Sequence, residues 1–316
     1  MTAETGPMTA TTGAMATETG SIYDLGYRRY DGPRLGRAHA IRSLFLHSLR
    51  SSYGIGRGSR AKIAPIALLF LVSIPAIAII AAQALIRQFP GGGQGLGDQL
   101  PVRFATYASS IGVFVVLFCA AQAPDLFGRD QRHKLLALYF ARALRRTDYA
   151  LARIGGFMVA VFLLQLLPQV ILFLGQVLLA TDVGGKFLED LPDLVRAAAQ
   201  AAATAGLLGG LSMAVSAFTP RRAYAVAGII AIFVIPSIVA GIVNELGSED
   251  LGRWMVLLSP TSVLAGVNGF FFHVPVSSGD GGFVPFISDW AYLAAAGLGI
   301  AGSVVLAIRR FVRLTV

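Results

Sequence analysis

The chain has 316 residues, of which 55% are hydrophobic and 14% charged, and its mean hydropathy is +0.68. These values lie outside the range of soluble domains of this size and indicate an integral membrane protein. The formal net charge of +9 does not indicate nucleic-acid binding, because the basic residues cluster at the ends of apolar runs and form no separate basic domain. Cys119 is the single cysteine, which excludes a disulfide framework and a cysteine-based metal site.

The N-terminal region is polar. Residues 1–20 are rich in Thr, Ala, Glu and Gly and lack both a basic n-region and an apolar core, so we expect a disordered cytoplasmic tail and no signal peptide. We expect residues 21–62 to form a cytoplasmic arm and an amphipathic helix, because apolar residues recur at helical spacing between 37 and 53. This helix would lie in the headgroup layer with Arg42 and Arg50 against anionic lipid. A surface helix of a cytoplasmic domain is the weaker alternative, since no such domain follows.

Six apolar runs reach the length of about twenty residues that spans a hydrocarbon core of about 30 Å. They cover residues 63–86, 104–124, 153–180, 194–218, 225–243 and 290–308. Four segments that would lie on the same side of the membrane hold 21 of the 26 Lys and Arg residues: 1–62, 125–153, 219–224 and 309–316. The positive-inside rule therefore places these segments, with both termini, in the cytoplasm. The prediction is an all-α, multi-pass protein of the cytoplasmic membrane, with residues 63–316 as a six-helix transmembrane domain surrounded by membrane lipid.

The segment 125–153, between the second and third runs, is strongly basic. It carries seven Lys or Arg residues, and between His133 and Leu144 its leucines and Tyr139 recur near helical spacing with basic residues in the gaps. This pattern predicts a short amphipathic helix on the membrane surface.

Four motifs follow one another here: Pro124-Asp125 at the end of one run, Arg129-Asp130, Leu136-x-Leu138-Tyr139, and Arg146 to Tyr149 at the start of the next run. Together they resemble the first intracellular loop of type-2 ABC transporter permeases, and the resemblance extends as a general layout over residues 20–316. The chain departs from that pattern at Ala143, where a proline is usual. It departs again at His133-Lys134-Leu135, where Gly or Asn followed by Thr-Leu is usual.

The resemblance implies that segment 125–153 is a coupling loop, whose coupling helix docks on a separate ATPase subunit. The residues implied in this ATPase coupling are Asp130, Arg132, His133, Leu136, Leu138, Tyr139 and Arg142. The resemblance also implies an interfacial elbow helix near residues 37–53, and a second permease, identical or related, that completes a homo- or heterodimer.

ATP and Mg would be bound by the partner ATPase, because this sequence has no Walker A motif. We expect no metal site, since the four histidines are scattered without metal-ligand spacing. We also expect no catalytic residue and no nucleic-acid partner.

The stretch 254–274 is apolar enough to be mistaken for a seventh span. A seventh span would place the Arg-rich C-terminus outside, against the charge rule. The Ser259-Pro260 break, with Gly266 and Gly269, instead favours two short helices that enter the outer leaflet and return. The resembled family has such a re-entrant hairpin before its last helix, so we expect one in the external region 244–289.

The predicted spans contain no charged residue near their centres, which disfavours a proton or sodium relay. Gln165, Gln169 and Gln176 fall within about 40° of one another on the third helix at 100° per residue. The plainer interpretation is interhelical hydrogen bonding, worth about 0.6 kcal/mol each. The alternative is a polar strip in an otherwise apolar translocation path.

The favoured hypothesis is the permease subunit of an ATP-driven exporter of an amphipathic or lipid-like compound, such as a drug, antibiotic or glycolipid. One alternative is a membrane enzyme that acts on lipid-linked substrates through acidic residues of the external loops. Another is a non-transporting sensor or scaffold that uses the same kind of ATPase. An ATPase encoded next to this chain would favour the first or third hypothesis over the second.

Overall fold

Six long helices dominate the computed structural model, which describes residues 32, 35–86, 88, 104–141, 144–246, 249–273 and 287–313. They are α2 (Ser59–Ile86), α4 (Gly112–Arg132), α6 (Arg146–Leu179), the continuous α7–η1–α8 (Val183–Phe218), α9 (Arg222–Glu245) and α12 (Asp289–Arg313). Each contains a stretch long and apolar enough to cross a membrane, and a helix satisfies its own backbone hydrogen bonds in lipid. The number of candidate spans among the described residues equals the predicted six, and these helices suggest a multi-pass membrane protein.

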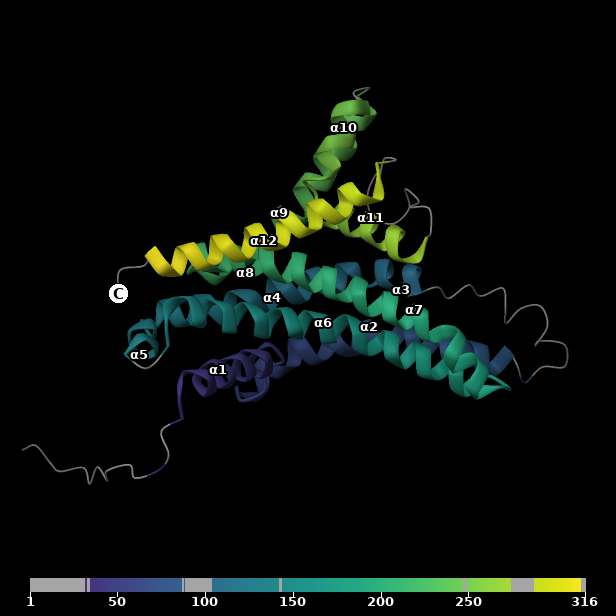
Figure 1. Cartoon of the computed structure of the whole chain (residues 1–316), viewed down its shortest axis with the longest axis horizontal. Coiled ribbons are helices and arrows are strands. Elements are labelled where there is room, and N and C mark those ends of the chain that lie inside the picture. Colours follow the sequence, from purple (N-terminus) through teal and green to yellow (C-terminus); the bar gives the residue numbers. More distant parts are fainter. Residues whose placement is uncertain are drawn as a thin grey trace, which may run out of the picture. The chain divides into compact units, whose positions relative to one another are not determined.

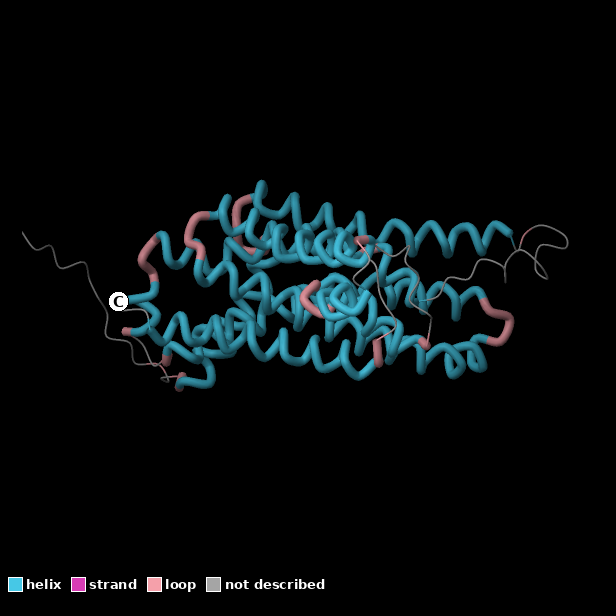
Figure 2. Tube along the Cα trace, turned by 90° about the horizontal axis from the view of Figure 1, so that it is seen from above, coloured by secondary structure: helices cyan, strands magenta, loops and turns pink. Residues whose placement is uncertain are grey.

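Most of these helices lie side by side within one unit, residues 35–316, and the end of α9 rises away from the others (Figure 1). Within the described ranges the chain consists of helices and connecting loops without strands (Figure 2), as the all-α prediction requires. The predicted tail, 1–20, and the arm up to residue 31 lie outside the described residues.

The second span does not occupy its predicted position. The predicted run 104–124 is broken at Ile111 into α3 (Phe104–Ser110) and α4, and α4 continues to Arg132. The prediction that Pro124 ends this helix was wrong, because the charged residues that follow it are paired with residues of other segments and stay helical. The connection to α6 therefore shortens from 125–153 to 133–145.

The end of α4 is a left-handed turn. Lys134 adopts a φ of 54°, a conformation more common for glycine, and the Leu135 amide donates to the Asp130 carbonyl at 3.0 Å. Among the described residues that follow, Leu136–Phe140 form the short helix α5, which covers part of the amphipathic helix predicted from His133 to Leu144.

The amphipathic helix predicted near residues 37–53 is present as α1 (Arg37–Ser52). It packs along α6 (Figure 1) and buries Leu44 and Ser48 there. A Cβ at Gly156 of α6 would lie 2.8 Å from the carbonyl oxygen of Phe45, so the absence of a side chain permits this close crossing. The apolar stripe of α1 is therefore covered largely by the protein itself.

The stretch that resembles a seventh span forms two short helices, α10 (Glu249–Val256) and α11 (Pro260–Phe272). Ser259 caps α11, because its hydroxyl accepts the Ser262 amide at 3.3 Å, and Pro260 occupies the first turn, where it costs no hydrogen bond. The predicted break at Ser259-Pro260 is confirmed. α11 packs against α7, α9 and α12.

The fourth span contains a π-helical segment, η1 (Ala205–Gly209). It is followed by α8 (Gly210–Phe218), which α12 packs along. A Cβ at Gly210 would overlap Ser303 Oγ of α12, so the serine hydroxyl would have to move to admit a side chain there. The main apolar core joins α4, α6, α8 and α12, and Phe118 of α4 stacks with Phe157 of α6 at 6.2 Å between ring centroids.

Candidate functional site

One end of the helical unit gathers basic side chains around α5. We call it the basic end: it carries the C-terminal end of α4, α5, the first turns of α6 and the last turns of α12 (Figure 1). Arg146 of α6 donates to the Val312 carbonyl of α12 at 3.0 Å, which joins two of these elements directly.

The residues predicted to couple to an ATPase divide into buried and exposed groups. Asp130 and Leu136 are buried, with 4% and 7% of their surface exposed, so they cannot contribute much to a docking surface. Leu138 is 67% exposed and projects from α5. Arg132 and His133 are exposed where α4 ends. Tyr139 is half-buried, and Arg142 lies outside the described residues.

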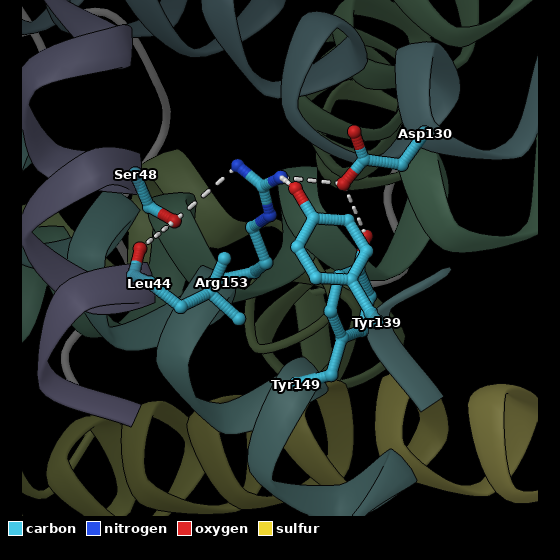
Figure 3. A network of polar contacts seen from close by, with 6 residues as sticks. All are labelled: Leu44, Ser48, Asp130, Tyr139, Tyr149 and Arg153. Carbon is cyan, nitrogen blue, oxygen red and sulfur yellow. Dashed lines mark hydrogen bonds and ion pairs between the residues drawn. The ribbon is translucent and has the colours of Figure 1, made fainter. Parts of the chain in front are cut away.

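Arg153 of α6 is the centre of a polar network that holds α5 in place (Figure 3). Its Nη2 donates to Asp130 Oδ2 of α4 at 2.5 Å and to the Tyr139 hydroxyl of α5 at 3.3 Å. Its Nη1 donates to Ser48 Oγ of α1 at 3.4 Å. Tyr149 Oη donates to the same Asp130 oxygen at 2.6 Å. One guanidinium therefore connects four helices.

This ion pair is buried. The side chains of Arg153 and Asp130 are 3% and 6% exposed, and the guanidinium lies over the rings of Tyr139 and Tyr149, 5.8 and 5.7 Å from their centroids. Charges in such a site are poorly screened, so each depends strongly on its partner. The rings add cation–π attraction to the pairing.

Sequence reasoning placed Arg153 at the end of the loop and gave it no role. The available signal was a charged residue at the start of an apolar helix, which requires a partner when the helix is packed in protein. The partner, Asp130, lies in a different helix, and nothing local in the sequence connects the two.

A second ionic cluster joins three segments at the same end. Asp125 of α4 accepts from Nη1 of Arg57, in the turn before α2, at 3.1 Å. Its other oxygen lies 3.6 Å from Nε of Arg222, at the start of α9. Asp125 thus links α4 to the turn before α2 and to the start of α9, near the end of α4 that is predicted to face the cytoplasm.

Two groups of α1 have shifted pKa values. Burial lowers the pKa of His47, and the nearby positive charge of Arg153 lowers it further. The pKa of Arg37 is raised, chiefly by its hydrogen bonds to Asp148, whose oxygens lie 2.6 and 2.7 Å away. The first residue of α1 is thereby fixed to the first turn of α6.

A cavity of about 480 Å³ lies between α3, α4, α6, α7, α9 and α11. Its walls are mostly apolar, for example Val115, Leu208 and Phe233, and no charged side chain of the described residues lines it. The exposed lining residues, such as Val113 at 67% and Ile238 at 55%, belong to α4 and α9. The cavity therefore opens between these two helices.

A chain of three polar side chains forms part of the cavity wall. Gln165 Nε2 of α6 donates to Gln200 Oε1 of α7 at 2.5 Å, and Gln200 Nε2 donates to Thr204 Oγ1 at 3.2 Å. Thr204 Oγ1 in turn donates to the Gln200 carbonyl at 3.0 Å. All three residues are at most 4% exposed, and Gln165 Oε1 has no hydrogen-bond partner in the described part of the chain.

The predicted glutamine strip is only partly assembled. Gln165 lines the cavity, whereas Gln169 and Gln176 are not among its lining residues. Gln169 is fully buried, and neither of its amide atoms has a hydrogen-bond partner within the described ranges. Gln176 is half-buried. Gln200 and Thr204, which sequence reasoning did not select, complete the polar group instead.

No group of three or more His, Cys, Asp or Glu residues suited to a metal ion occurs within the described ranges. Comparison of the chain with protein-family models gives no match, and comparison with curated proteins gives no significant match either. Function is therefore inferred from the geometry of the basic end and of the cavity.

Proposed function

We propose that this chain is the membrane-spanning subunit of an exporter that is driven by a separate ATPase. The observation that carries the proposal is α5, a short helix with an exposed leucine, Leu138, whose base is anchored through Arg153 to α1, α4 and α6. An exposed apolar side chain at the tip of a rigidly anchored helix suits docking into a pocket of a partner protein.

The anchoring explains how a force on α5 would reach the membrane-spanning helices. Tyr139 connects α5 to Arg153, and Arg153 connects to the ends of α4 and α6. A movement of α5 toward or away from the bundle would therefore displace both helices together. ATP-driven closure of the ATPase would supply that movement, with ATP and Mg bound by the partner.

The basic end would face the cytoplasm, as the positive-inside rule requires, with both termini on that side. In this orientation α1 would serve as an elbow helix at the cytoplasmic boundary, and α10 and α11 would lie toward the outer surface as the re-entrant region, although α10 packs along α9 and not along α11. A second copy of the chain or a related permease would complete the transporter. The apolar cavity favours an amphipathic or lipid-like cargo.

The test is affinity purification of the full chain from its own cells, followed by assay of the purified complex for ATP hydrolysis. We expect an ATPase to copurify, and Leu138→Asp to lower its recovery at least tenfold, because a carboxylate cannot enter an apolar pocket unpaired. Leu246→Asp is the matched control, since Leu246 is also exposed, at 78%, and lies after α9. Recovery without an ATPase, or equal losses in both variants, would contradict the proposal.

A further inference from the structure

The cavity combines a wide apolar wall with a hydrogen-bonded polar corner, and Ser109, Ser237, Thr261 and Asn268 also line it. Gln165, Gln200 and Thr204 form that corner, and the exposed lining residues Val113 and Ile238 form an apolar rim. At a rise of about 1.5 Å per residue, Gln165 lies roughly 18 Å along α6 from Arg153. The polar corner is thus well inside the candidate span and far from the basic end.

The hydrogen bonds within the corner fix which buried atom is left without a donor among the described residues. The Thr204 hydroxyl donates to the Gln200 carbonyl, so it accepts from Gln200 Nε2. Gln200 Oε1 must then face Gln165 Nε2, which donates to it. This arrangement leaves Gln165 Oε1, a buried acceptor, without a donor in the described part of the chain. A buried amide oxygen gains when it acquires a donor, because burial has removed its water.

We propose that the cavity binds an uncharged, largely apolar molecule whose hydroxyl or amide N–H donates a hydrogen bond to Gln165 Oε1. This inference deepens the proposed function, since it defines the chemical class of the cargo. A volume of about 480 Å³ lies within the range of pockets for small organic ligands. An ionised ligand is disfavoured because no charged side chain of the described residues lines the cavity to compensate its burial.

The rim indicates how such a molecule reaches the cavity. The opening lies between α4 and α9, and its exposed residues are aliphatic. A molecule dissolved in the hydrocarbon layer would meet no polar barrier there. We therefore assign the entry route to the lipid side of the helices, between α4 and α9.

The experiment uses three photoactivatable probes with the purified full chain in lipid nanodiscs: a diazirine-bearing hexadecanol, its methyl ether, and the corresponding ionised fatty acid. We expect the alcohol to label cavity-lining peptides of α4 and α9 about fivefold more than the ether, because only the alcohol donates a hydrogen bond. The fatty acid should label them least. Labelling of α2, where Phe70 is 68% exposed, measures the background from lipid contact.

Two substitutions locate the site. Gln165→Leu should remove the difference between alcohol and ether. Ala265→Phe, which fills the cavity from α11 with apolar volume, should reduce labelling by both. Ala301→Phe on the exposed face of α12 is its matched control and should change neither. If Gln165→Leu does not fold, the comparison of probes on the unaltered chain still decides.

Equal labelling of the cavity by alcohol and ether in the unaltered chain would overturn the inference. Preference for the alcohol that persists unchanged in Gln165→Leu would also overturn it. The proposed function can be rejected independently of the binding site. If no ATPase copurifies but the Gln165-dependent preference for the alcohol holds, the binding site is supported and the exporter function is contradicted. If an active ATPase complex shows no such preference, the cargo assignment alone is wrong.

Discussion

Arg153→Met should destabilise the protein severely. The substitution keeps an unbranched apolar stem but removes the cation that faces Asp130, whose side chain is 6% exposed. Removal of one partner of a buried ion pair costs about 3–5 kcal/mol, because the remaining charge is left without compensation. Arg196→Met is the control, since Arg196 pairs with Asp193 on the surface, where both side chains are more than 40% exposed, at 45% and 43%. That change should cost less than about 1 kcal/mol.

The contribution of the pair itself is separated by a double-mutant cycle with Asp130→Asn. The neutral amide no longer needs a cation, so the double variant should recover much of the stability that Arg153→Met loses. We expect a coupling energy of about 1–3 kcal/mol, measured by circular dichroism during unfolding in mixed detergent and SDS. Coupling below about 0.5 kcal/mol, or equal losses in Arg153→Met and Arg196→Met, would refute the role of Arg153 as the anchor of four helices.

The same variants test whether the network holds α5. Leu136 is 7% exposed in α5, whereas Leu138 is 67% exposed. In a Cys119→Ala background, a thiol introduced by Leu136→Cys should react with maleimide at least tenfold faster once Arg153→Met releases the helix. A thiol introduced by Leu138→Cys should react at the same rate in both backgrounds. Protection of the Leu136→Cys thiol despite Arg153→Met would mean that α5 is held by packing alone.

Three further predictions concern other parts of the bundle and use thermal unfolding in detergent. Gln169→Leu should leave Tm unchanged or raise it, because neither amide atom has a hydrogen-bond partner among the described residues. Gln165→Leu should cost about 1–3 kcal/mol by leaving the buried acceptor Gln200 Oε1 without its donor. Gly266→Ala should cost about 1–3 kcal/mol, because its Cβ would overlap the buried Tyr292 ring. Burial and neighbouring cations lower the pKa of His47, so below the ordinary histidine pKa of about 6.5 the unfolded chain binds the proton more readily than the folded chain. The stability of the protein should therefore fall as pH falls below this value. His47→Gln should flatten that pH dependence.

The six spans could be predicted because hydropathy averages over a whole membrane thickness and tolerates local errors. Their ends could not be predicted in the same way. α4 continues past Pro124 because Asp125 and Asp130 find arginines that are distant in sequence, so charges that look like a loop are internal to a helix. Such pairings are set by the packing of helices, and a single sequence does not reveal them.

The two sites differ in how far sequence could predict them. A short helix was predicted in the segment around α5 and is present there, but Asp130 and Leu136 are buried and not exposed, which only the three-dimensional packing decides. In the cavity, Gln165 was expected to share a strip with other glutamines of its own helix. Its actual partner, Gln200, comes from an alanine-rich part of α7, where one polar residue among small ones was the signal to notice.

The anchor and the cavity are connected by one helix. Arg153 and Gln165 both belong to α6, and the segment between them contains no proline, since Pro168 lies beyond Gln165. Gly155 and Gly156 lie within this segment, but it is continuously helical, so under the proposed function a displacement at Arg153 would be transmitted along it toward Gln165. Gln200 belongs to α7, so under the proposed function a displacement of α5 would move Gln165 relative to Gln200 and stretch their 2.5 Å hydrogen bond. Because the geometry of this bond positions Gln165 Oε1, the same displacement would also change the affinity of the cavity for a hydrogen-bond donor.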